Sequence, residues 1–171
     1  MVESVDSPAQ YDARSFGEFV RAHDKQLRGV AWSVVRDRHQ TDDVMQAAYE
    51  KAFRALPGFD GRSTMSTWLH SIVYRAALDH LRYEGRRRHD DVDDLRNLGG
   101  GGGDSAAAGG VGRVELDAVM GQLGPEDRTA LMLVAGWGYS YDDAAEILGE
   151  ARGTVASRVS RARRRLERWE Q

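Results

Sequence analysis

The side chains best suited to bind a ligand are the arginines and the serine near the C-terminus, and the chemistry they can provide is contact with nucleic acid. Guanidinium groups donate hydrogen bonds to phosphate oxygens and to base edges, and a serine hydroxyl can do the same. The segment carries Ser157, Arg158, Arg161, Arg164, Arg165 and Arg168. At helical spacing these residues lie away from an apolar face, so the segment predicts a helix with one DNA-binding side.

The elements around this helix have the sequence pattern of a helix-turn-helix. One side of the basic helix is apolar, with Val155, Val159, Ala162, Leu166 and Trp169. A preceding helix over 140–148 ends at Gly149, which can adopt the positive φ of a helix end. A short turn then leads into the basic helix, as in DNA-binding domains of this kind. The alternative for an arginine-rich run is a solvated helix face.

A glycine-rich segment divides the 171 residues into two small domains. Three arginines at 86–88 are followed by Asp90, Asp91, Asp93 and Asp94, then by runs of glycine and alanine. This stretch lacks the apolar side chains that could offset the entropy of ordering, so it predicts a flexible tether. The expected division is an N-terminal tail over 1–13, a domain over 14–85, a linker over 86–112 and a second domain over 113–171.

Apolar periodicity predicts that the first domain begins with two helices. The first has an apolar stripe from Phe16 to Val34 that includes His23, interpreted as a packed histidine with one satisfied ring nitrogen. The second is expected to begin at Thr41, whose hydroxyl can cap it, and to end near Leu56. The proline and glycine that follow stop a helix.

A third helix is expected from Thr67 to Tyr83, with His70 and Tyr74 facing outward or toward a groove. All segments with clear periodicity are therefore helical. The predicted fold class is all-α, with two small helical domains joined by a flexible Gly-rich linker.

Composition excludes several classes of protein. The chain has no cysteine, which excludes disulfides, thiol catalysis and cysteine-ligated metal sites. It has no phosphate-binding glycine loop, no carboxylates at metal spacing and no nucleophile beside a base, so we expect neither an enzyme nor a cofactor or metal site. No apolar run could insert into a membrane and no signal peptide begins the chain, which predicts a cytoplasmic protein. The net charge of -3 combines clustered arginines with separate acidic patches.

Three blocks of sequence, in order, resemble a known family. They are 41–53 (TDDVMQAAYEKAF), 59–69 (FDGRSTMSTWL) with 78–82 (LDHLR), and 153–163 (GTVASRVSRAR). The chain resembles the extracytoplasmic-function (ECF, group 4) sigma factors of the sigma-70 family. The resemblance covers almost the whole chain and implies a bacterial transcription initiation factor that recognises a -35 duplex and a melted -10 element.

The resemblance also implies partners and roles for single residues. The first domain would be sigma region 2, which binds the clamp helices of the largest subunit of core RNA polymerase and the -10 element. The second would be region 4, which reads the -35 element; the flap region of polymerase and an anti-sigma factor are further implied partners.

The resemblance also implies which residues make these contacts. The implied polymerase contacts are Asp42, Asp43, Gln46, Glu50 and Arg54. The implied -10 contacts are Gly61, Arg62, Ser63, Thr64, Arg75 and Arg82. The implied -35 contacts are Arg152, Thr154, Ser157, Arg158, Ser160, Arg161 and Arg164.

Arg161 is the strongest candidate for a bidentate contact with guanine. Ala47, Arg75 and Ala156 depart from residues that are common in the family, which leaves the promoter sequence open. By the same resemblance, the four aspartates of the linker could mimic nucleic-acid phosphates inside polymerase, or serve only as a solubilising spacer. The alternative function is a stand-alone helix-turn-helix regulator that acts without entering polymerase.

Overall fold

The computed structural model describes residues 13–92 and 117–168, and these residues are helical with short connections. The first domain consists of α1 (Ala13–Val35), α2 (Arg38–Ala55), the short 3-10 turn η2 (Leu56–Gly58) and α3 (Met65–Val92). The second has a helical segment at 117–121, then α5 (Pro125–Leu131), the π-helical turn η3 (Met132–Gly136), α6 (Tyr141–Leu148) and α7 (Arg152–Glu167). The predicted all-α class is confirmed for the described residues.

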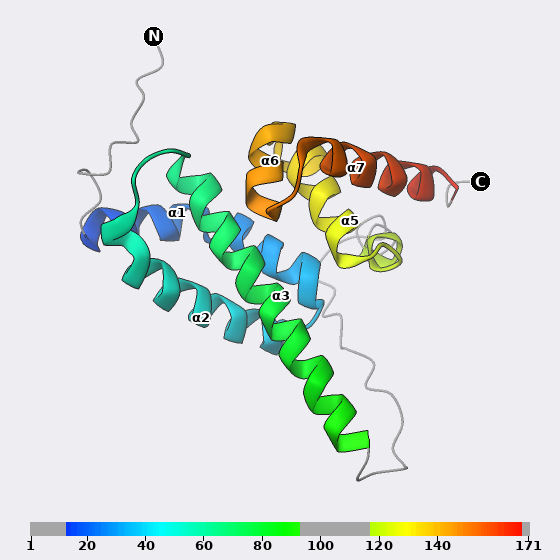
Figure 1. Ribbon diagram of the computed structural model, residues 1–171, viewed down its shortest axis with the longest axis horizontal. Helices are drawn as coiled ribbons and strands as arrows, with labels where there is room; N and C mark the ends of the chain where they lie inside the picture. The colour runs from blue at the N-terminus through cyan, green and yellow to red at the C-terminus, as the bar shows by residue number, and fades with distance from the viewer. Residues whose placement is uncertain (1–12, 93–116, 169–171) are drawn as a thin grey trace.

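In the first domain α3 lies across both α1 and α2 (Figure 1), and their apolar faces make one core. Its side chains include Leu27, Val30, Val44, Met45, Leu69 and Val73, each at most 1% exposed. The helical spacing of apolar residues in the sequence therefore fixes which face of each helix is buried. His23 lies at the edge, where its Nδ1 is 2.9 Å from the carbonyl of Phe19, as expected of a packed histidine.

Two helix boundaries differ from those expected. Thr41 does not cap α2, because the helix begins a turn earlier, and the side chain of Asp37 accepts a 2.8 Å hydrogen bond from the Gln40 amide. Thr41 is instead buried, and its hydroxyl donates to the Asp37 carbonyl. Helix α3 continues to Val92 rather than ending near Tyr83, because the only helix-weakening residue in this stretch is a single glycine, which costs about 1 kcal/mol. Linker residues 93–112 and the tail residues 1–12 lie outside the described ranges.

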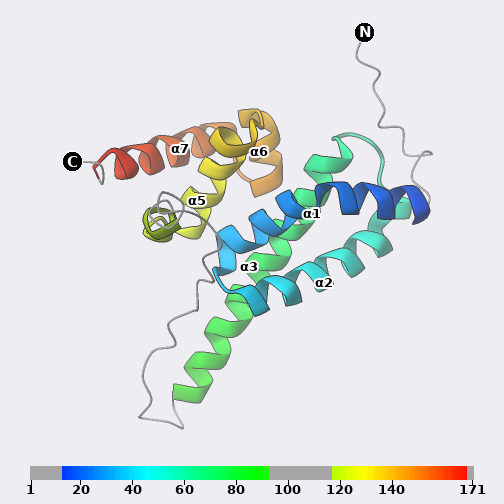
Figure 2. The same ribbon diagram turned by 180° about the vertical axis from the view of Figure 1, so that it is seen from behind.

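The two domains are packed against each other. Figures 1 and 2 show α5, α6 and α7 grouped beside α1 and α3, and the contacts run from α3 to α6 and from α1 to α5. His70 and Tyr74, expected to face outward or toward a groove, are instead 0% and 2% exposed. They are buried because α3 carries a second packing face that is covered by the second domain.

Polar contacts hold this interface. The hydroxyls of Ser33 and Thr129 lie 2.7 Å apart, and those of Ser66 and Tyr139 lie 2.6 Å apart. Arg128 is 6% exposed, and its guanidinium donates to the carbonyl of Ser33 and to carbonyls of its own domain. Burial, together with the nearby charge of another arginine, lowers the pKa of Arg128 to about 10. The buried cation is therefore compensated by carbonyl dipoles.

Candidate nucleic-acid interface

The helix-turn-helix is built by α6, a glycine turn and α7. Ser140 caps α6 by accepting from the Asp143 amide, and Gly149 ends it with a φ of 68°. A residue with a Cβ would be strained at that φ, so glycine permits the tight turn. Val155, Val159 and Ala162 are at most 1% exposed and pack α7 on the rest of the domain. The remaining faces of α7 are therefore available to a ligand.

The seven residues expected to contact the -35 element are all on α7 but differ in exposure. Arg152, Thr154, Ser157, Arg161 and Arg164 are exposed, whereas Ser160 and Arg158 are half-buried. Ser157 donates to the carbonyl of Gly153 at 3.0 Å, and Arg164 to the hydroxyl of Ser160 at 3.0 Å. Thr154, Ser157, Arg161 and Arg164 lie on the side of α7 that faces away from the buried residues, so this side presents basic and hydroxyl groups. Arg152 lies on a different side at the start of the helix, where it pairs with Asp142 of α6 at 3.3 Å.

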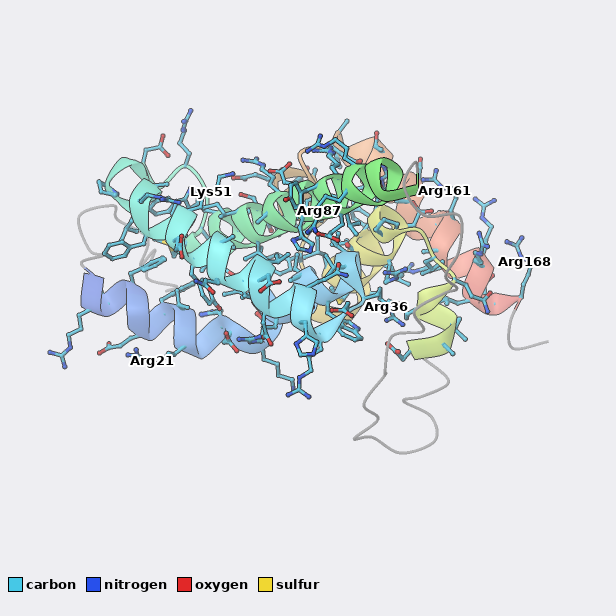
Figure 3. The ribbon with its side chains drawn as sticks, turned by 90° about the horizontal axis from the view of Figure 1, so that it is seen from below. Arg21, Arg36, Lys51, Arg87, Arg161 and Arg168 are labelled. Atoms are coloured by element: carbon cyan, nitrogen blue, oxygen red, sulfur yellow. The ribbon has the colours of Figure 1, made fainter. Side chains whose placement is uncertain are left out.

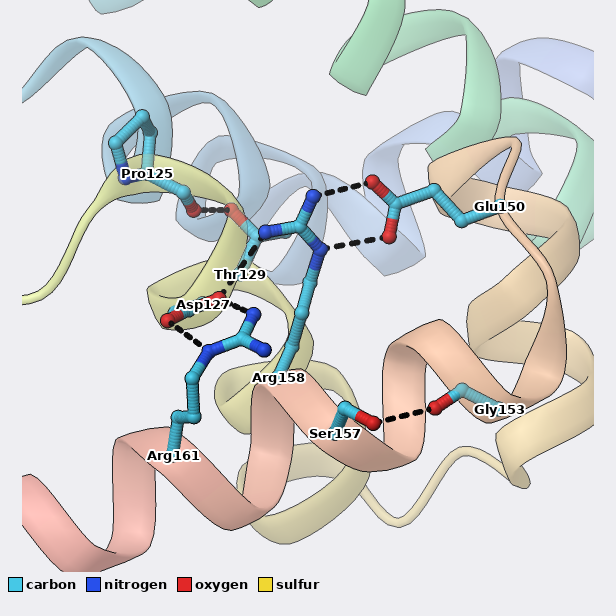
Figure 4. A network of polar contacts seen from close by, with 8 residues as sticks. All are labelled: Pro125, Asp127, Thr129, Glu150, Gly153, Ser157, Arg158 and Arg161. Carbon is cyan, nitrogen blue, oxygen red and sulfur yellow. Dashed lines mark hydrogen bonds and ion pairs between the residues drawn. The ribbon is translucent and has the colours of Figure 1, made fainter.

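Arg158 occupies a polar network within the second domain (Figure 4). Its Nε and Nη2 donate to the two carboxylate oxygens of Glu150 at 2.7 and 2.6 Å, and its Nη1 donates to Asp127 at 3.1 Å. The side chain is 20% exposed, and the hydrogen bond with Glu150 raises the pKa of Arg158. The network fixes α7 relative to α5 and to the turn after α6.

Arg161 contacts the same carboxylate from the other side (Figure 4). Its Nη2 lies 3.0 Å from Asp127 Oδ1 and its Nε 3.4 Å from Oδ2, while the side chain remains 54% exposed. Arg161 and Arg168 lie at one end of the molecule in Figure 3, and Arg21 and Lys51 lie at the other. The basic groups of α7 therefore form a surface separate from the basic groups at the far end of the first domain.

The loop expected to contact the -10 element joins η2 to α3. Gly61 has a φ of 71°, and Arg62 is exposed and paired with Asp60 at 2.6 Å. Thr64 caps α3, because its hydroxyl accepts from the Thr67 amide at 3.1 Å. The loop borders a cavity of about 430 Å³ lined by Gly58, Phe59, Asp60, Arg62, Ser63, Trp68 and Glu146. Glu146 belongs to α6, so the second domain forms one wall of this cavity.

Arg75 and Arg82 are exposed on α3, two turns apart and so on the same side of the helix. Arg82 pairs with Asp79 at 3.2 Å. Together with Arg62 in the loop, they give the first domain exposed cations along α3, which suits contact with a phosphate backbone.

The five residues expected to contact polymerase are all exposed on α2. These residues are Asp42, Asp43, Gln46, Glu50 and Arg54. Asp42 pairs with Arg28 of α1 at 2.5 Å, and Arg28 also pairs with Asp24 at 2.9 Å. The hydrogen bond with Asp42 raises the pKa of Arg28. The stripe is therefore a mixed polar surface that is held in place by α1.

Sequence reasoning missed two groups of residues. Asp127 and Glu150 organise the arginines of α7, but no fixed spacing links them to those arginines in the sequence. Gly29 and Trp137 meet at the domain interface, where Trp137 lies against the backbone of α1. Close packing of a glycine by a distant tryptophan leaves no periodic signal. Among the described residues, no cluster of three potential metal ligands is present. No helix in the described ranges is long and apolar enough to span a membrane.

Comparison with known proteins identifies the family. The model of Sigma-70 region 2 matches residues 19–87, and that of Sigma-70, region 4 matches residues 113–166. The ECF RNA polymerase sigma factor SigM of Mycobacterium tuberculosis is 36% identical over 92% of this chain and 78% of its own length. The chain belongs to the ECF RNA polymerase sigma factors. The RNA polymerase sigma-H factor of Pseudomonas aeruginosa is 35% identical to this sigma factor, over 92% of it and 86% of the relative.

Solved structures agree with this assignment. The sigma factor RpoE from Bartonella quintana, in complex with the anti-sigma factor NepR, has a TM-score of 0.76 and 29% identity, over 91% of this sigma factor and 96% of RpoE. CnrH, in complex with the cytosolic domain of CnrY, has a TM-score of 0.66 and 26% identity, over 95% of this sigma factor and 91% of CnrH.

This sigma factor is a transcription initiation factor that associates with RNA polymerase and directs it to promoters. Its helix-turn-helix is the DNA-binding part of region 4. The alternative of a stand-alone regulator is not favoured, because both sigma regions are present in one chain.

Proposed function

We propose that the exposed side of α7 reads the -35 duplex, with Arg161 contacting a guanine. The single observation that supports this most is the division of α7, which buries Val155 and Val159 and leaves Arg161 half exposed beside polar groups. A helix with one anchored face can enter the major groove with the other. Arg152, Thr154, Ser157, Ser160 and Arg164 would contact phosphates or bases beside it. Arg158 would contribute by fixing the helix in addition to any contact with DNA.

The first domain would bind the melted -10 strand. The loop with Gly61, Arg62, Ser63 and Thr64 borders a cavity that contains Phe59 and Trp68, whose rings lie 5.1 Å apart. Unpaired bases are retained by pockets and stacking groups, and their phosphates by cations. Arg75 and Arg82 on α3 would supply those cations. Glu146 of α6 also lines the cavity, so a movement of α6 would change access to it.

The polar stripe on α2 would bind the clamp helices of the largest polymerase subunit. Its five residues are exposed and lie on a single helix next to the exposed ring of Phe53, which is 55% exposed. An apolar ring surrounded by charged groups is typical of a protein-binding surface. Region 4 would contact the flap region. Region 2 would span 14–85 and region 4 would span 113–171. The segment between them, 86–112, would be the linker, and its first residues, 86–92, continue helix α3.

A factor that acts by binding polymerase and DNA needs no catalytic group, so we assign no enzymatic activity, and its site of action is the cytoplasm, where core polymerase is found. The two structural relatives were solved with an anti-sigma factor, NepR, and with the cytosolic domain of CnrY. We infer that a protein partner of the same kind sequesters this chain.

Run-off transcription tests the proposal as a whole. Core RNA polymerase and fragmented genomic DNA are combined with the full chain, and the 5′ ends that depend on the chain are mapped. Discrete starts with shared, spaced upstream elements are expected. An absence of dependent starts, together with no binding to core polymerase, would contradict the proposal.

Variants then separate the two DNA-reading roles. Arg161→Ala should cost about 1 to 3 kcal/mol and relax discrimination at one base of the upstream element. Arg164→Ala should weaken binding to all sequences alike. Equal losses on promoter DNA and on DNA with a scrambled upstream element, for both variants, would show that Arg161 does not read a base. On α2, Glu50→Ala should weaken core binding more than Lys51→Ala, its exposed neighbour outside the stripe.

A further inference from the structure

The carboxylate of Asp127 lies between two arginines of the DNA-reading helix. Asp127 is in the first turn of α5, a different element from α7, and its side chain is 23% exposed. Oδ1 accepts from Arg158 at 3.1 Å and from Arg161 at 3.0 Å, and Oδ2 lies 3.4 Å from the Nε of Arg161 (Figure 4). Asp127 therefore contacts two arginines of the candidate -35 surface: Arg158, which is the most buried, and Arg161, which is the proposed base-reading residue.

We propose that Asp127 is a specificity-determining residue that positions Arg161 for base reading. Its carboxylate holds one edge of the guanidinium, so that the other edge is presented to the duplex and is withheld from the phosphates. This inference rests on the proposed role of Arg161 at the -35 element. It assigns a function to a residue of another helix, α5.

The geometry of the guanidinium supports this role. Asp127 occupies the edge formed by Nε and Nη2, the edge at which arginine usually binds a carboxylate in two parallel hydrogen bonds. The hydrogens on Nη1 and the second hydrogen on Nη2 remain free of Asp127. One hydrogen of Nη1 and the second hydrogen of Nη2 form the other fork of the planar group, and a fork of this kind matches O6 and N7 of guanine.

Asp127 is itself held firmly enough to act as a support. Arg158 donates to it and is fixed in turn by the two hydrogen bonds to Glu150. Partial burial alone would raise the pKa of Asp127, but hydrogen bonds from Arg161 and Arg158 outweigh it and hold the pKa below its ordinary value. The carboxylate is therefore charged at neutral pH. An arginine tethered to a fixed charge loses less conformational entropy when it binds a base than a free one does.

The same contact restrains non-specific binding. A free arginine on a DNA-facing helix can reach phosphates on any sequence, and each such contact steepens the dependence of affinity on salt. Asp127 offsets the charge of Arg161, so the attraction of this arginine to a phosphate is weaker than that of an unpaired arginine. Guanine is neutral and is bound through the hydrogen-bond geometry of the free fork, so it loses less from the offset.

The test uses holoenzyme, assembled from core polymerase and the full chain, and a promoter fragment mapped by run-off transcription and randomised in its upstream element. Bound fragments are sequenced to give the preference at each base. Asp127→Asn keeps the shape and a neutral acceptor but removes the charge. Glu126→Gln is the matched control, since it removes one charge from the same turn. Within the described ranges Glu126 forms no ion pair with α7, and its charge acts on Arg158 only at longer range. Asp127→Glu, which keeps the charge, tests for rescue.

With Asp127→Asn, we expect the guanine preference that depends on Arg161 to fall by about five-fold or more. The slope of log affinity against log salt on a scrambled element should steepen by about one. Glu126→Gln should change neither quantity, and Asp127→Glu should restore both toward wild type. In an Arg161→Ala background, Asp127→Asn should have no further effect on the preference, because its action passes through that arginine.

Two outcomes would overturn the inference, and they differ. If Arg161→Ala lowers the guanine preference but Asp127→Asn behaves as Glu126→Gln does, Asp127 does not position Arg161, and the proposed function stands. If Arg161→Ala leaves every base preference unchanged, the base-reading role of Arg161 is wrong and the inference fails with it. Thermal unfolding of each variant accompanies the binding data, and a stability loss without the change in salt slope also overturns the inference.

Discussion

Arg158 and Arg161 are three residues apart on one helix, yet their surroundings differ. Arg158 is 20% exposed and forms two hydrogen bonds with Glu150, whereas Arg161 is 54% exposed. A pair of charges that is partly removed from water depends on its partner far more than an exposed pair does. An arginine therefore stabilises the domain at position 158, whereas three residues later Arg161 keeps more than half of its side chain exposed to a ligand.

This difference predicts that the two arginines contribute unequally to stability. Arg158→Ala should lower the free energy of unfolding by roughly 2 kcal/mol, because Glu150 and Asp127 would lose a partner while they remain largely covered. Arg161→Ala should change it by less than about 0.5 kcal/mol. Urea denaturation of the full chain, followed by circular dichroism, measures both. Equal stability of the two variants would show that the network around Arg158 adds nothing to folding.

The lowered pKa of His70 predicts that the stability of the fold depends on pH. Burial is the main cause that lowers the pKa of His70 from 6.5 to about 4; the charge of His23 lowers it further, and a hydrogen bond with the Ser66 carbonyl partly opposes both. The folded chain therefore holds a neutral His70 at a pH where the unfolded chain is protonated. Its contribution to stability is complete above pH 6.5 and is lost as the pH falls toward 4.

The loss over this pH range should be roughly 3 kcal/mol. Urea denaturation at several pH values measures it, and His70→Gln is the comparison, because that variant keeps a polar side chain but does not titrate. The free energy of unfolding of His70→Gln should fall less between pH 6.5 and 4. Parallel curves for the two proteins would mean that His70 is protonated equally in both states.

The ends of a helix can be predicted from the sequence where a cap or a turn requires a particular residue. Gly149 ends α6 with positive φ, as its position in the sequence predicts. The start of α2 was predicted wrongly, because Thr41 and Asp37 are both plausible capping residues and only the turn after α1 distinguishes them. Arg36 in that turn has a φ of 56°, which allows α2 to begin at Arg38, directly after its cap.

The cap at Asp37 predicts a measurable effect. Asp37→Ala should lower the free energy of unfolding by about 1 kcal/mol, since the Gln40 amide would lose its acceptor at the helix start. Asp37→Asn should retain most of the stability, because asparagine is an equally good cap. Denaturant titrations of the two variants would decide the matter, and a loss as large for Asn as for Ala would assign the effect to charge instead of capping.

The sequence predicts the buried face of each helix but not the packing of one domain on another. Val44, Val73 and Val155 lie on three different helices, and each belongs to a series of apolar residues at helical spacing. Their burial therefore follows from a local pattern. His70 and Tyr74 are buried by residues about seventy positions away along the chain, and a polar residue on a second helix face carries no sign of such a neighbour. For the same reason, the sequence predicts exposed arginines on α7 but gives no sign of Asp127 and Glu150, which pair with two of the arginines of that helix.

At the scale of the whole molecule, the docked domains restrict what the chain can bind at one time. Promoter elements near -35 and -10 lie roughly 85 Å apart at about 3.4 Å per base pair. Tyr139 touches Ser66 beside the -10 loop, and α7 has only 16 residues, or about 24 Å. The two proposed DNA-reading surfaces are therefore within a few tens of Å in the docked state, and simultaneous binding of both elements through them would require the domains to separate.

Gly29 gives direct experimental control over this separation. A Cβ added there would lie 2.6 Å from Cζ2 of Trp137 and 2.8 Å from its Cη2, closer than real Cβ contacts. Gly29→Ala should therefore displace the tryptophan and weaken docking by roughly 1 to 3 kcal/mol, the usual cost of overpacking. Gly17→Ala on the same helix is the control, because its Cβ would meet only a flexible arginine at 3.6 Å.

Because the chain has no cysteine, dyes can be attached at Lys51→Cys and Arg163→Cys, one exposed position in each domain and both away from Gly17 and Gly29 in the sequence, to follow docking by energy transfer. Transfer should be lower in Gly29→Ala than in the otherwise unsubstituted chain, and Gly17→Ala should match the latter. Addition of core polymerase and promoter DNA should lower transfer in all three, since each must open to span the two elements. Unchanged transfer in Gly29→Ala would mean that Trp137 does not hold the domains together, and unchanged transfer on promoter DNA would contradict the requirement for opening.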